Sequence, residues 1–306
     1  MSKSPLAINL EYFLLRFCCG LVNVIPYPLA MAVARGLGWM VFTVFGFKRK
    51  RTLKRIRGVF PEKSEKEAKA IAVRSLQNIL QTAVEMMRAP QLDRKWMDRY
   101  VKDGQFYKDK LQAYVDEGKG VVIMVPHSGN WYMAAWSMAK YGLPLFAIAA
   151  RQRNPKLNAW MSRQYGDIEV LDRDCRDTLS QIREKLSAGR AFAILPDLRV
   201  RKKDVEAEFF GGKANVSRSG AAFAVKSGCP IVVAAMTRQG GRHVFNHIAT
   251  LRPDPNAADR KEEARRLTRE ALKLLSDEIM KSPGDWYWFN KRWILEPPED
   301  GFAKEN

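Results

Sequence analysis

One histidine, with a polar turn behind it, is the residue of this sequence best placed to carry out proton chemistry. His127 follows a run of apolar residues at 121–126, and Ser128, Gly129 and Asn130 continue the turn. This pattern predicts a buried strand, a turn and then a helix, with the histidine at the carboxyl end of the strand. Ligands collect at that end of the strands in open α/β sheets. Since imidazole exchanges protons near neutral pH, we predict that His127 is a general base.

A histidine that acts as a base needs a second group to fix its tautomer and stabilise its charged form. Two residues of the sequence are candidates for this task. Tyr132, in the first turn of the next helix, offers a phenol oxygen but no charge, because a phenol ionises at roughly pH 10. Asp197 offers a carboxylate and follows another apolar strand, at residues 191–195, so it should lie at the same edge of the sheet. The imidazole is therefore predicted to be held by Tyr132 or by Asp197.

The elements around these residues alternate between strands and helices. Short β-branched runs predict strands, and apolar residues at helical spacing predict helices. The predicted strands cover residues 121–125, 145–149, 168–171, 191–195 and 231–236, with an antiparallel edge strand at 243–251. The predicted helices cover residues 52–92, 131–138, 155–165, 175–186, 217–227 and 259–281, and Ser64 and Glu67 form a capping box within the first of these. This order predicts an α/β fold with a mostly parallel central sheet flanked by helices.

Two apolar segments near the N-terminus are separated by prolines and followed by a dense basic cluster. They cover residues 12–25 and 29–47, and residues 48–51 read Lys-Arg-Lys-Arg. An apolar helix that ends in basic residues is typical of an anchor on the inner leaflet of a membrane. The second segment has about the 20 residues needed to cross a bilayer, although Arg35 within it favours an interfacial or re-entrant helix. A hairpin buried in a soluble core is the alternative.

These features divide the chain into three predicted parts: a membrane-associated helical segment at 1–51, an α/β domain at 52–296 and a polar tail at 297–306. The formal net charge of +19, from 52 Lys and Arg against 33 Asp and Glu, indicates an anionic partner. Phospholipid headgroups, a phosphorylated lipid, an acidic carrier protein and nucleic acid all satisfy this requirement. The four cysteines form no Cys-x-x-Cys pair, which favours a reducing compartment.

The turn at His127 resembles the His-x4-Asp/Glu motif of the glycerolipid and lipid A acyltransferases. The most similar branch contains the lauroyl and myristoyl transferases of lipid A biosynthesis and the mannoside acyltransferases. Members of that branch often have His-x-Gly-Asn-Trp followed by Glu or Asp, and this sequence keeps the frame from His127 to Trp131. The acid position, however, is Tyr132. The resemblance thus implies an acyltransferase whose usual dyad lacks its carboxylate.

Two further blocks resemble the same family, and the resemblance covers residues 10–295. Arg151 and Arg153 precede Asn-Pro at the start of a helix, where an arginine fork is suited to phosphate. Asp197 and a basic loop from Arg199 lead to Phe-Phe-Gly at 209–211. The resemblance implies that Arg151, Arg153 and Arg199 bind an anionic headgroup, the acyl donor or a carrier protein. Ordinary solvated loops are the alternative.

The resemblance implies a membrane-associated O-acyltransferase that moves a fatty acyl group from an acyl thioester to a hydroxyl of a glycolipid or phospholipid. Acyl carrier protein or acyl-CoA would be the donor, an anionic lipid the acceptor, and the cytoplasmic face of the inner membrane the location. His127 would take the hydroxyl proton. Ser128, Gly129 and Asn130 would shape the turn and help to bind the oxyanion. No cofactor and no metal are expected, since His243 and His247 lack a third ligand.

Two other hypotheses fit parts of the sequence. A degenerate member of the family would bind lipid or a partner protein without catalysis, and the tyrosine at position 132 is the reason to consider it. A basic nucleic-acid-binding protein would account for the charge, with the aromatic residues at 286–293 available for base stacking. The apolar N-terminus opposes the second hypothesis, and packing in the core or at an interface accounts better for the aromatic residues. We therefore predict no nucleic-acid partner.

Overall fold

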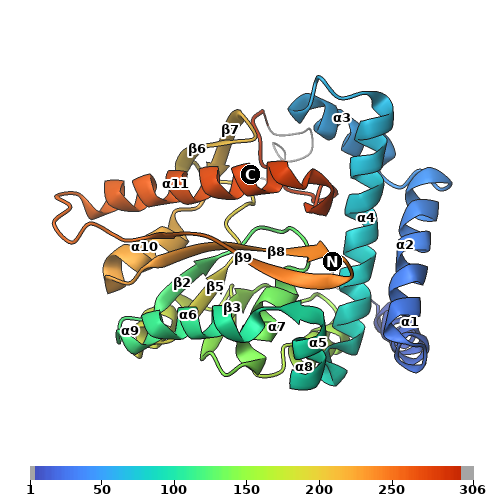
Figure 1. The fold of residues 1–306 in the computed structure, drawn as a ribbon, viewed down its shortest axis with the longest axis horizontal. Helices are drawn as coiled ribbons and strands as arrows, with labels where there is room; N and C mark the ends of the chain where they lie inside the picture. Colours follow the sequence, from blue (N-terminus) through green and yellow to red (C-terminus); the bar gives the residue numbers. More distant parts are fainter. Residues whose placement is uncertain (1–3, 298–306) are drawn as a thin grey trace.

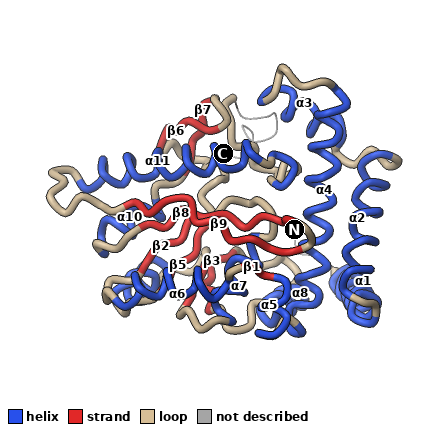
Figure 2. Tube along the Cα trace, viewed as in Figure 1, coloured by secondary structure: helices blue, strands red, loops and turns tan. Residues whose placement is uncertain are grey.

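Seven strands form a twisted central sheet with helices packed on both of its faces (Figures 1 and 2). The structure is a computed structural model that describes residues 4–297, so most of the predicted polar tail lies outside the described residues. The strand order is β1-β9-β8-β2-β5-β3-β4. Strands β8, β2, β5, β3 and β4 run parallel, β9 runs antiparallel to β8, and β1 is parallel to β9. The predicted α/β fold with a mostly parallel sheet is confirmed.

The elements have the following bounds. The strands are β1 Val101–Lys102, β2 Val121–Met124, β3 Leu145–Ala149, β4 Glu169–Asp172, β5 Ala191–Ile194, β6 Val205–Phe209, β7 Gly212–Val216, β8 Ile231–Gln239 and β9 Arg242–Leu251. The α-helices are α1 Pro5–Val24, α2 Tyr27–Thr43, α3 Arg49–Val59, α4 Glu65–Arg88, α5 Arg94–Tyr100, α6 Gly104–Asp116, α7 Trp131–Lys140, α8 Pro155–Gln164, α9 Thr178–Ser187, α10 Ser219–Ser227 and α11 Arg260–Lys281. Two short 3-10 turns, Ala89–Gln91 and Pro283–Asp285, complete the set.

Local signals account for several of these boundaries. Ser64 and Glu67 form the predicted capping box, with the Ser64 hydroxyl and the Glu67 carboxylate each accepting a backbone N–H of the other residue. Asn154 caps α8, which begins at Pro155, where the absence of an N–H costs nothing. Gly228, with a φ of 66°, ends α10 in the left-handed region that glycine adopts without strain. These caps set where the helices begin and end, and hence where the loops at the edge of the sheet lie.

Two parts of the fold differ from the sequence-based prediction. The strand predicted at the edge, β9, is not the edge strand, because the two-residue β1 pairs with its outer side. The basic loop after Asp197 contains a separate antiparallel hairpin, β6–β7, rather than irregular structure alone. In β6 the residues are alternately buried and exposed, which is the period-2 pattern of a strand with one face on the core.

Hydrophobic cores lie on both sides of the sheet. One contains side chains of β2, α6, α7 and α8, and a second contains side chains of α9, α10 and α11. A third cluster joins α3 and α4 to the β6–β7 hairpin and to the aromatic C-terminal segment. Trp286, Trp288 and Phe289 are all buried there, so the prediction that these aromatic residues pack in the core is confirmed.

Helix α4 crosses the carboxyl edge of the sheet, and α1, α2 and α3 lie against it (Figure 1). Within residues 4–297, α1 is a helix long and apolar enough to cross a membrane, by length and composition alone. The sequence predicted that the second apolar segment, at 29–47, would be the longer of the two. It forms the shorter helix, since α2 has 17 residues and ends at Thr43, whereas α1 has 20. Outward-facing apolar side chains cover both helices: Leu6, Leu10, Phe13, Leu14, Phe17, Leu21, Val24, Leu29, Val33, Leu37 and Trp39.

Candidate active site

His127 and Asp197 form a hydrogen-bonded pair at the carboxyl edge of the sheet. The imidazole Nδ1 lies 2.7 Å from Oδ1 of Asp197, and the backbone N–H of His127 donates to Oδ2 at 2.8 Å. A proton on Nδ1 donated to the carboxylate leaves the lone pair of the imidazole on Nε2. The His127 side chain is 17% exposed, whereas that of Asp197 is fully buried. This is the geometry of a general base held in one tautomer by a buried acid.

The strand register explains why two residues so far apart in the sequence meet. Strands β2 and β5 are adjacent and parallel, and Met124 pairs with Ile194. His127 and Asp197 each lie three positions beyond that pair (124 to 127 and 194 to 197). Chains that leave neighbouring parallel strands in register emerge side by side, so the two turns place their third residues in contact. The structure thus pairs the imidazole with the acid that its position after β5 had suggested.

Asp197 is held as a carboxylate by its surroundings. Burial alone would raise its pKa, but the charge of His127 and the hydrogen bonds from His127 and from the Trp286 indole outweigh that effect and lower the pKa below its ordinary value. The indole Nε1 of Trp286 donates to Oδ2 at 2.8 Å. With two donors on one oxygen and one on the other, the charged form is the favoured form. A carboxylate in this state stabilises an imidazolium on His127.

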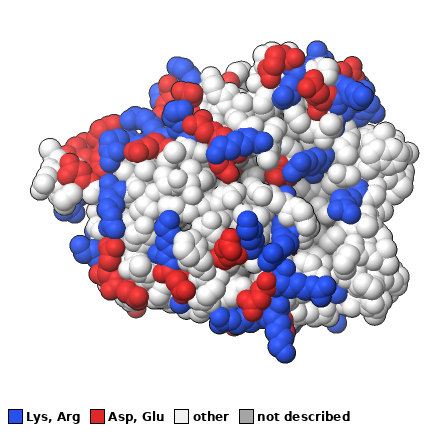
Figure 3. Space-filling model, in the orientation of Figure 1, with Lys and Arg blue, Asp and Glu red and all other residues white. Residues whose placement is uncertain are grey.

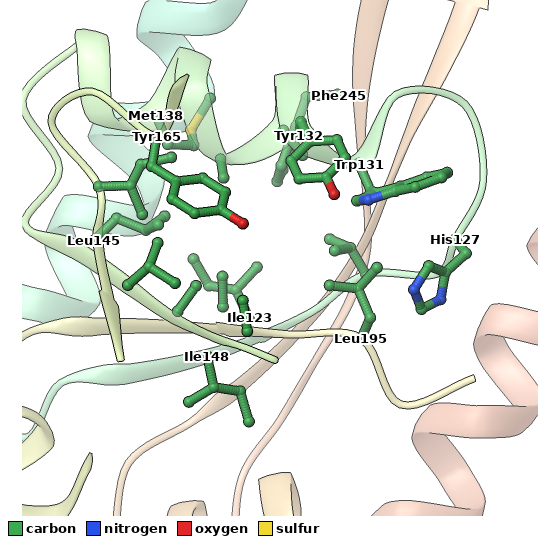
Figure 4. A pocket seen from close by; sticks show the side chains of 18 residues that line it. Ile123, His127, Trp131, Tyr132, Met138, Leu145, Ile148, Tyr165, Leu195 and Phe245 are labelled. Carbon is green, nitrogen blue, oxygen red and sulfur yellow. The ribbon is translucent and has the colours of Figure 1, made fainter. Parts of the chain in front are cut away.

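Tyr132, which stands at the acid position of the motif, has a different environment from that of Asp197. Within residues 4–297, no hydrogen bond joins it to His127; instead its ring packs between those of Trp131 and Trp136, at centroid distances of 5.5 and 5.6 Å. Burial raises the pKa of its phenol, so the group stays neutral. Figure 4 shows that its hydroxyl and that of Tyr165 both point into an apolar cavity. Of the two expected partners, Asp197 is the one that the imidazole contacts.

An apolar cavity of about 200 Å³ opens beside His127, which stands at one end of it (Figure 4). Most of its wall consists of aliphatic and aromatic side chains from β3 and α7, and from β2 and β5 or the residues that directly follow them: Ile123, Val125, Trp131, Ala134, Ala135, Met138, Leu145, Ala147, Ile148, Ala193 and Leu195. Tyr132 and Tyr165 supply hydroxyls within this wall, and burial raises the pKa of Tyr165 to about 12. A wall of this kind suits a hydrocarbon chain, with the reacting end of the ligand at His127.

The three residues after His127 hold the turn in shape. The backbone N–H groups of Ser128 and Gly129 donate to the carbonyls of Pro126 and Asp285, at 2.7 and 2.9 Å. The Asn130 side chain is buried, caps α7 through Met133, and donates to Glu85. These donors therefore serve the turn itself. The turn is thus held by contacts that its own residues make within the protein.

Gly129 is required by the closeness of a neighbouring strand. Its φ is 58°, in the region that glycine favours, and a Cβ at this position would lie 1.7 Å from the carbonyl oxygen of Met236. The carbonyl oxygen of Gly129 accepts a hydrogen bond from the Asn78 side chain on α4 at 2.8 Å. The turn is therefore clamped between β8 and α4, and this clamp fixes the position of His127.

A buried ionic network around Glu85 contacts the turn through Asn130. Glu85 on α4 is fully buried and accepts hydrogen bonds from Tyr27, Asn130, Arg238 and His243. Burial opposes its ionisation, but the charges of Arg238 and His243 outweigh that effect and hold its pKa well below the ordinary value. Glu85 lies within the helix predicted at residues 52–92, but the sequence did not indicate its partners on α2, β8 and β9, which only the tertiary fold brings together.

The three arginines expected to bind an anion lie at two separate places. Arg151 is largely exposed and pairs with Asp172 at 2.6 Å, at the rim of a second cavity of about 290 Å³ that shares lining residues with the apolar one. Arg153 is exposed in the same loop. Arg199 is mostly buried and contacts Glu296 at 3.2 Å, and in the described part of the chain its Nη1 has no hydrogen-bond partner. Of the three arginines, Arg151 alone is among the residues that line these two cavities.

The histidines of β9 are used elsewhere. His243 is buried against Glu85, and His247 contacts Lys110 and Thr250. Among the described residues, no three His, Cys, Asp or Glu side chains are grouped so that they would hold a metal ion.

The chain is similar to known acyltransferases. A family model described as "Bacterial lipid A biosynthesis acyltransferase" matches residues 2–294. The chain is 24% identical over 204 residues to a phosphatidylinositol mannoside acyltransferase of Mycolicibacterium smegmatis, and the match covers 64% of each protein. It is also 24% identical over 226 residues to a protein of the same name from Mycobacterium tuberculosis, covering 72% of this chain and 69% of the relative. The match thus spans slightly less than two thirds of the first relative's length.

Proposed function

Because the chain belongs to the bacterial lipid A biosynthesis acyltransferase family, we propose that it is a membrane-associated O-acyltransferase. It would move a fatty acyl group from a thioester of acyl carrier protein or CoA to a hydroxyl of a glycolipid or phospholipid. The observation that carries this proposal is the 2.7 Å contact between His127 and Asp197 at the end of an apolar cavity. Since Asp197 replaces the acid missing at Tyr132, the geometry supports catalysis over a degenerate, binding-only protein.

The proposed reaction follows from the tautomer of His127. Its Nε2 removes the proton of the acceptor hydroxyl while the oxygen attacks the thioester carbonyl carbon, and Asp197 stabilises the imidazolium. The tetrahedral intermediate then collapses, the carbon–sulfur bond breaks, and the thiolate takes the proton from Nε2. An ester and a free thiol are the products. The acyl chain would lie in the apolar cavity, and no metal or redox group takes part.

The N-terminal helices favour attachment to the membrane surface. The outer face of α1 is apolar, but its other side is fixed to the body of the protein: Asn154 donates to the Ile8 carbonyl and Arg88 to the carbonyls of Val22 and Ile25. A helix bound along its length to an α/β domain suits an interfacial position better than a spanning one. We propose that α1 and α2 lie in one leaflet, on the cytoplasmic side.

Acyl transfer by the purified full-length protein tests the proposal. The donor is a long-chain acyl thioester of carrier protein or CoA, the acceptor is a total membrane lipid extract, and the readouts are thiol release and the mass of the acylated lipid. His127→Ala should abolish transfer, while His247→Ala, the same change at a histidine outside the cavity, should leave it near the wild-type rate. Full activity in His127→Ala would refute the catalytic role, and no transfer by the wild type would favour a degenerate protein.

A further inference from the structure

A larger cleft, with a volume of about 620 Å³, opens between α2, α4 and the turn of the β8–β9 hairpin. Five arginines line it, and the lining contains a single carboxylate, that of Asp285. We call this the basic cleft and define it by the residues Arg35, Arg74, Arg99, Arg238, Arg242 and Asp285. Neither His127 nor any other residue of the apolar cavity lines it.

Two of the five arginines are neutralised within the protein. Arg238 forms a two-pronged ion pair with Glu85, and Arg74 pairs with Asp285 at 2.9 Å. For the other three, Arg35, Arg99 and Arg242, the described residues place no carboxylate within ion-pair distance. Arg99 lies over the Tyr100 ring, and Arg242 reaches the carbonyl of Asp98 at 3.5 Å. Three uncompensated guanidinium groups on three different elements thus converge on one cleft.

The basic cleft lies beside the apolar surface of the N-terminal helices. Arg35, on α2, lines the cleft, whereas Leu37 and Trp39 of the same helix are exposed. Figure 3 shows basic side chains between the sheet and the uncharged surface that α1 and α2 form. If the apolar surface enters a lipid leaflet, the cleft lies at the level of the headgroups. At that level, one guanidinium group can bind two oxygens of a lipid phosphate.

We propose that the basic cleft binds a phosphate group, and that the group belongs to the headgroup of an anionic phospholipid of the membrane. This site is additional to the acyl-transfer site and its occupancy does not require catalysis. Asn78 connects the two places, because its Oδ1 accepts a hydrogen bond from Arg238 and its Nδ2 donates to the carbonyl of Gly129. A bound headgroup would therefore lie one side chain away from the turn that carries His127.

Binding to purified full-length protein in a neutral detergent tests the proposal. The probes are a short-chain phosphatidylglycerol and inorganic phosphate, and the readouts are calorimetric affinity and its dependence on salt. The test variant carries Arg35→Gln, Arg99→Gln and Arg242→Gln. The control carries the same charge change at three exposed residues of α9, α10 and α11, at the opposite end of the sheet: Arg183→Gln, Lys226→Gln and Arg260→Gln. Circular dichroism verifies that both variants fold, as exposed positions lead us to expect.

The test variant should bind the anionic lipid at least about tenfold more weakly, since each lost charge-assisted contact costs about that factor, while the control keeps the wild-type affinity. If inorganic phosphate binds, loses affinity in the test variant and the lipid does not bind, the basic cleft is a phosphate site but its ligand is soluble, which contradicts the assignment to a lipid headgroup. Equal losses in both variants, or no loss in the test variant, would overturn the proposal. His127→Ala should bind lipid like the wild type, which separates this outcome from any failure of acyl transfer.

Discussion

The indole of Trp286 donates a hydrogen bond of 2.8 Å to Oδ2 of Asp197, although the two residues lie 89 positions apart in the chain. The same segment contacts the turn twice more, because the backbone N–H of Tyr287 donates to the His127 carbonyl and that of Gly129 to the Asp285 carbonyl. The C-terminal aromatic segment therefore positions both members of the pair.

Removing the indole donor should slow the reaction without changing the fold. Trp286→Phe keeps an aromatic ring in the core but leaves Oδ2 of Asp197 with only the backbone donor of His127. We expect kcat to fall about tenfold or more with little change in KM, since a hydrogen bond to a buried charge contributes roughly 1.5–3 kcal/mol. Trp136→Phe is the matched control, because that buried indole N–H has no partner in the described structure. Equal effects in both variants would assign the loss to packing.

Replacing the carboxylate itself should have a much larger effect. Asp197→Asn keeps the size of the side chain but removes the charge that stabilises the imidazolium and no longer fixes the tautomer of His127. The corresponding change in a protease triad costs on the order of 10⁴ in rate, and we expect a loss of this order here. Single-turnover transfer from the thioester measures it. Activity within tenfold of the wild type would show that another group holds the imidazole.

Tyr132 should matter little to the chemical step, in contrast to its place in the motif. Its hydroxyl faces the apolar cavity and, among the described residues, makes no hydrogen bond with His127. Tyr132→Phe should therefore keep kcat within about threefold and act mainly on the preference for acyl-chain length, since it removes a polar group from the wall. Competition between thioesters of different chain length measures that preference. A fall in kcat as large as that of Asp197→Asn would show that Tyr132 takes part in catalysis.

The parallel sheet was predictable from the sequence, and so was Asp197 as one of two candidate partners of His127, because both depend on local patterns. Apolar runs mark the strands, and residues that follow neighbouring parallel strands must share an edge of the sheet. The orientation of Tyr132 was not predictable, since it depends on how its ring packs against those of Trp131 and Trp136 on the same helix. The donor Trp286 was not accessible either, because no sequence pattern states which loop a C-terminal segment covers. The hairpin β6 was missed although its alternating residues indicated it.

The Glu85 network should make stability sensitive to acid. Glu85→Gln leaves Arg238 buried without its counter-charge, and we expect a loss of about 3–5 kcal/mol at neutral pH. The folded-state pKa of Glu85 is lowered from 4.5, so unfolding takes up a proton as pH falls below that value. The stabilisation is complete above about pH 4.5 and is lost as pH falls through the lower folded-state pKa. Urea unfolding at a series of pH values measures the difference in free energy of unfolding between the wild type and Glu85→Gln, which should narrow only in that range. A difference that does not change with pH would show that the charge of Glu85 is not its cause. Glu184→Gln, at an exposed site on α9, is the control.

The apolar face of α1 should determine how tightly the protein holds to a neutral bilayer. Phe13 is 65% exposed on α1, and Phe106, on α6, is 64% exposed, so the two positions differ in location and not in exposure. Transfer of a phenylalanine side chain into lipid contributes roughly 1.5–3 kcal/mol. Phe13→Gln should therefore weaken partition into zwitterionic vesicles by about tenfold or more, whereas Phe106→Gln should leave it unchanged. Zwitterionic lipid keeps the contribution of the basic cleft small, so flotation of the two variants isolates the apolar contribution. If both variants float like the wild type, α1 does not enter the bilayer.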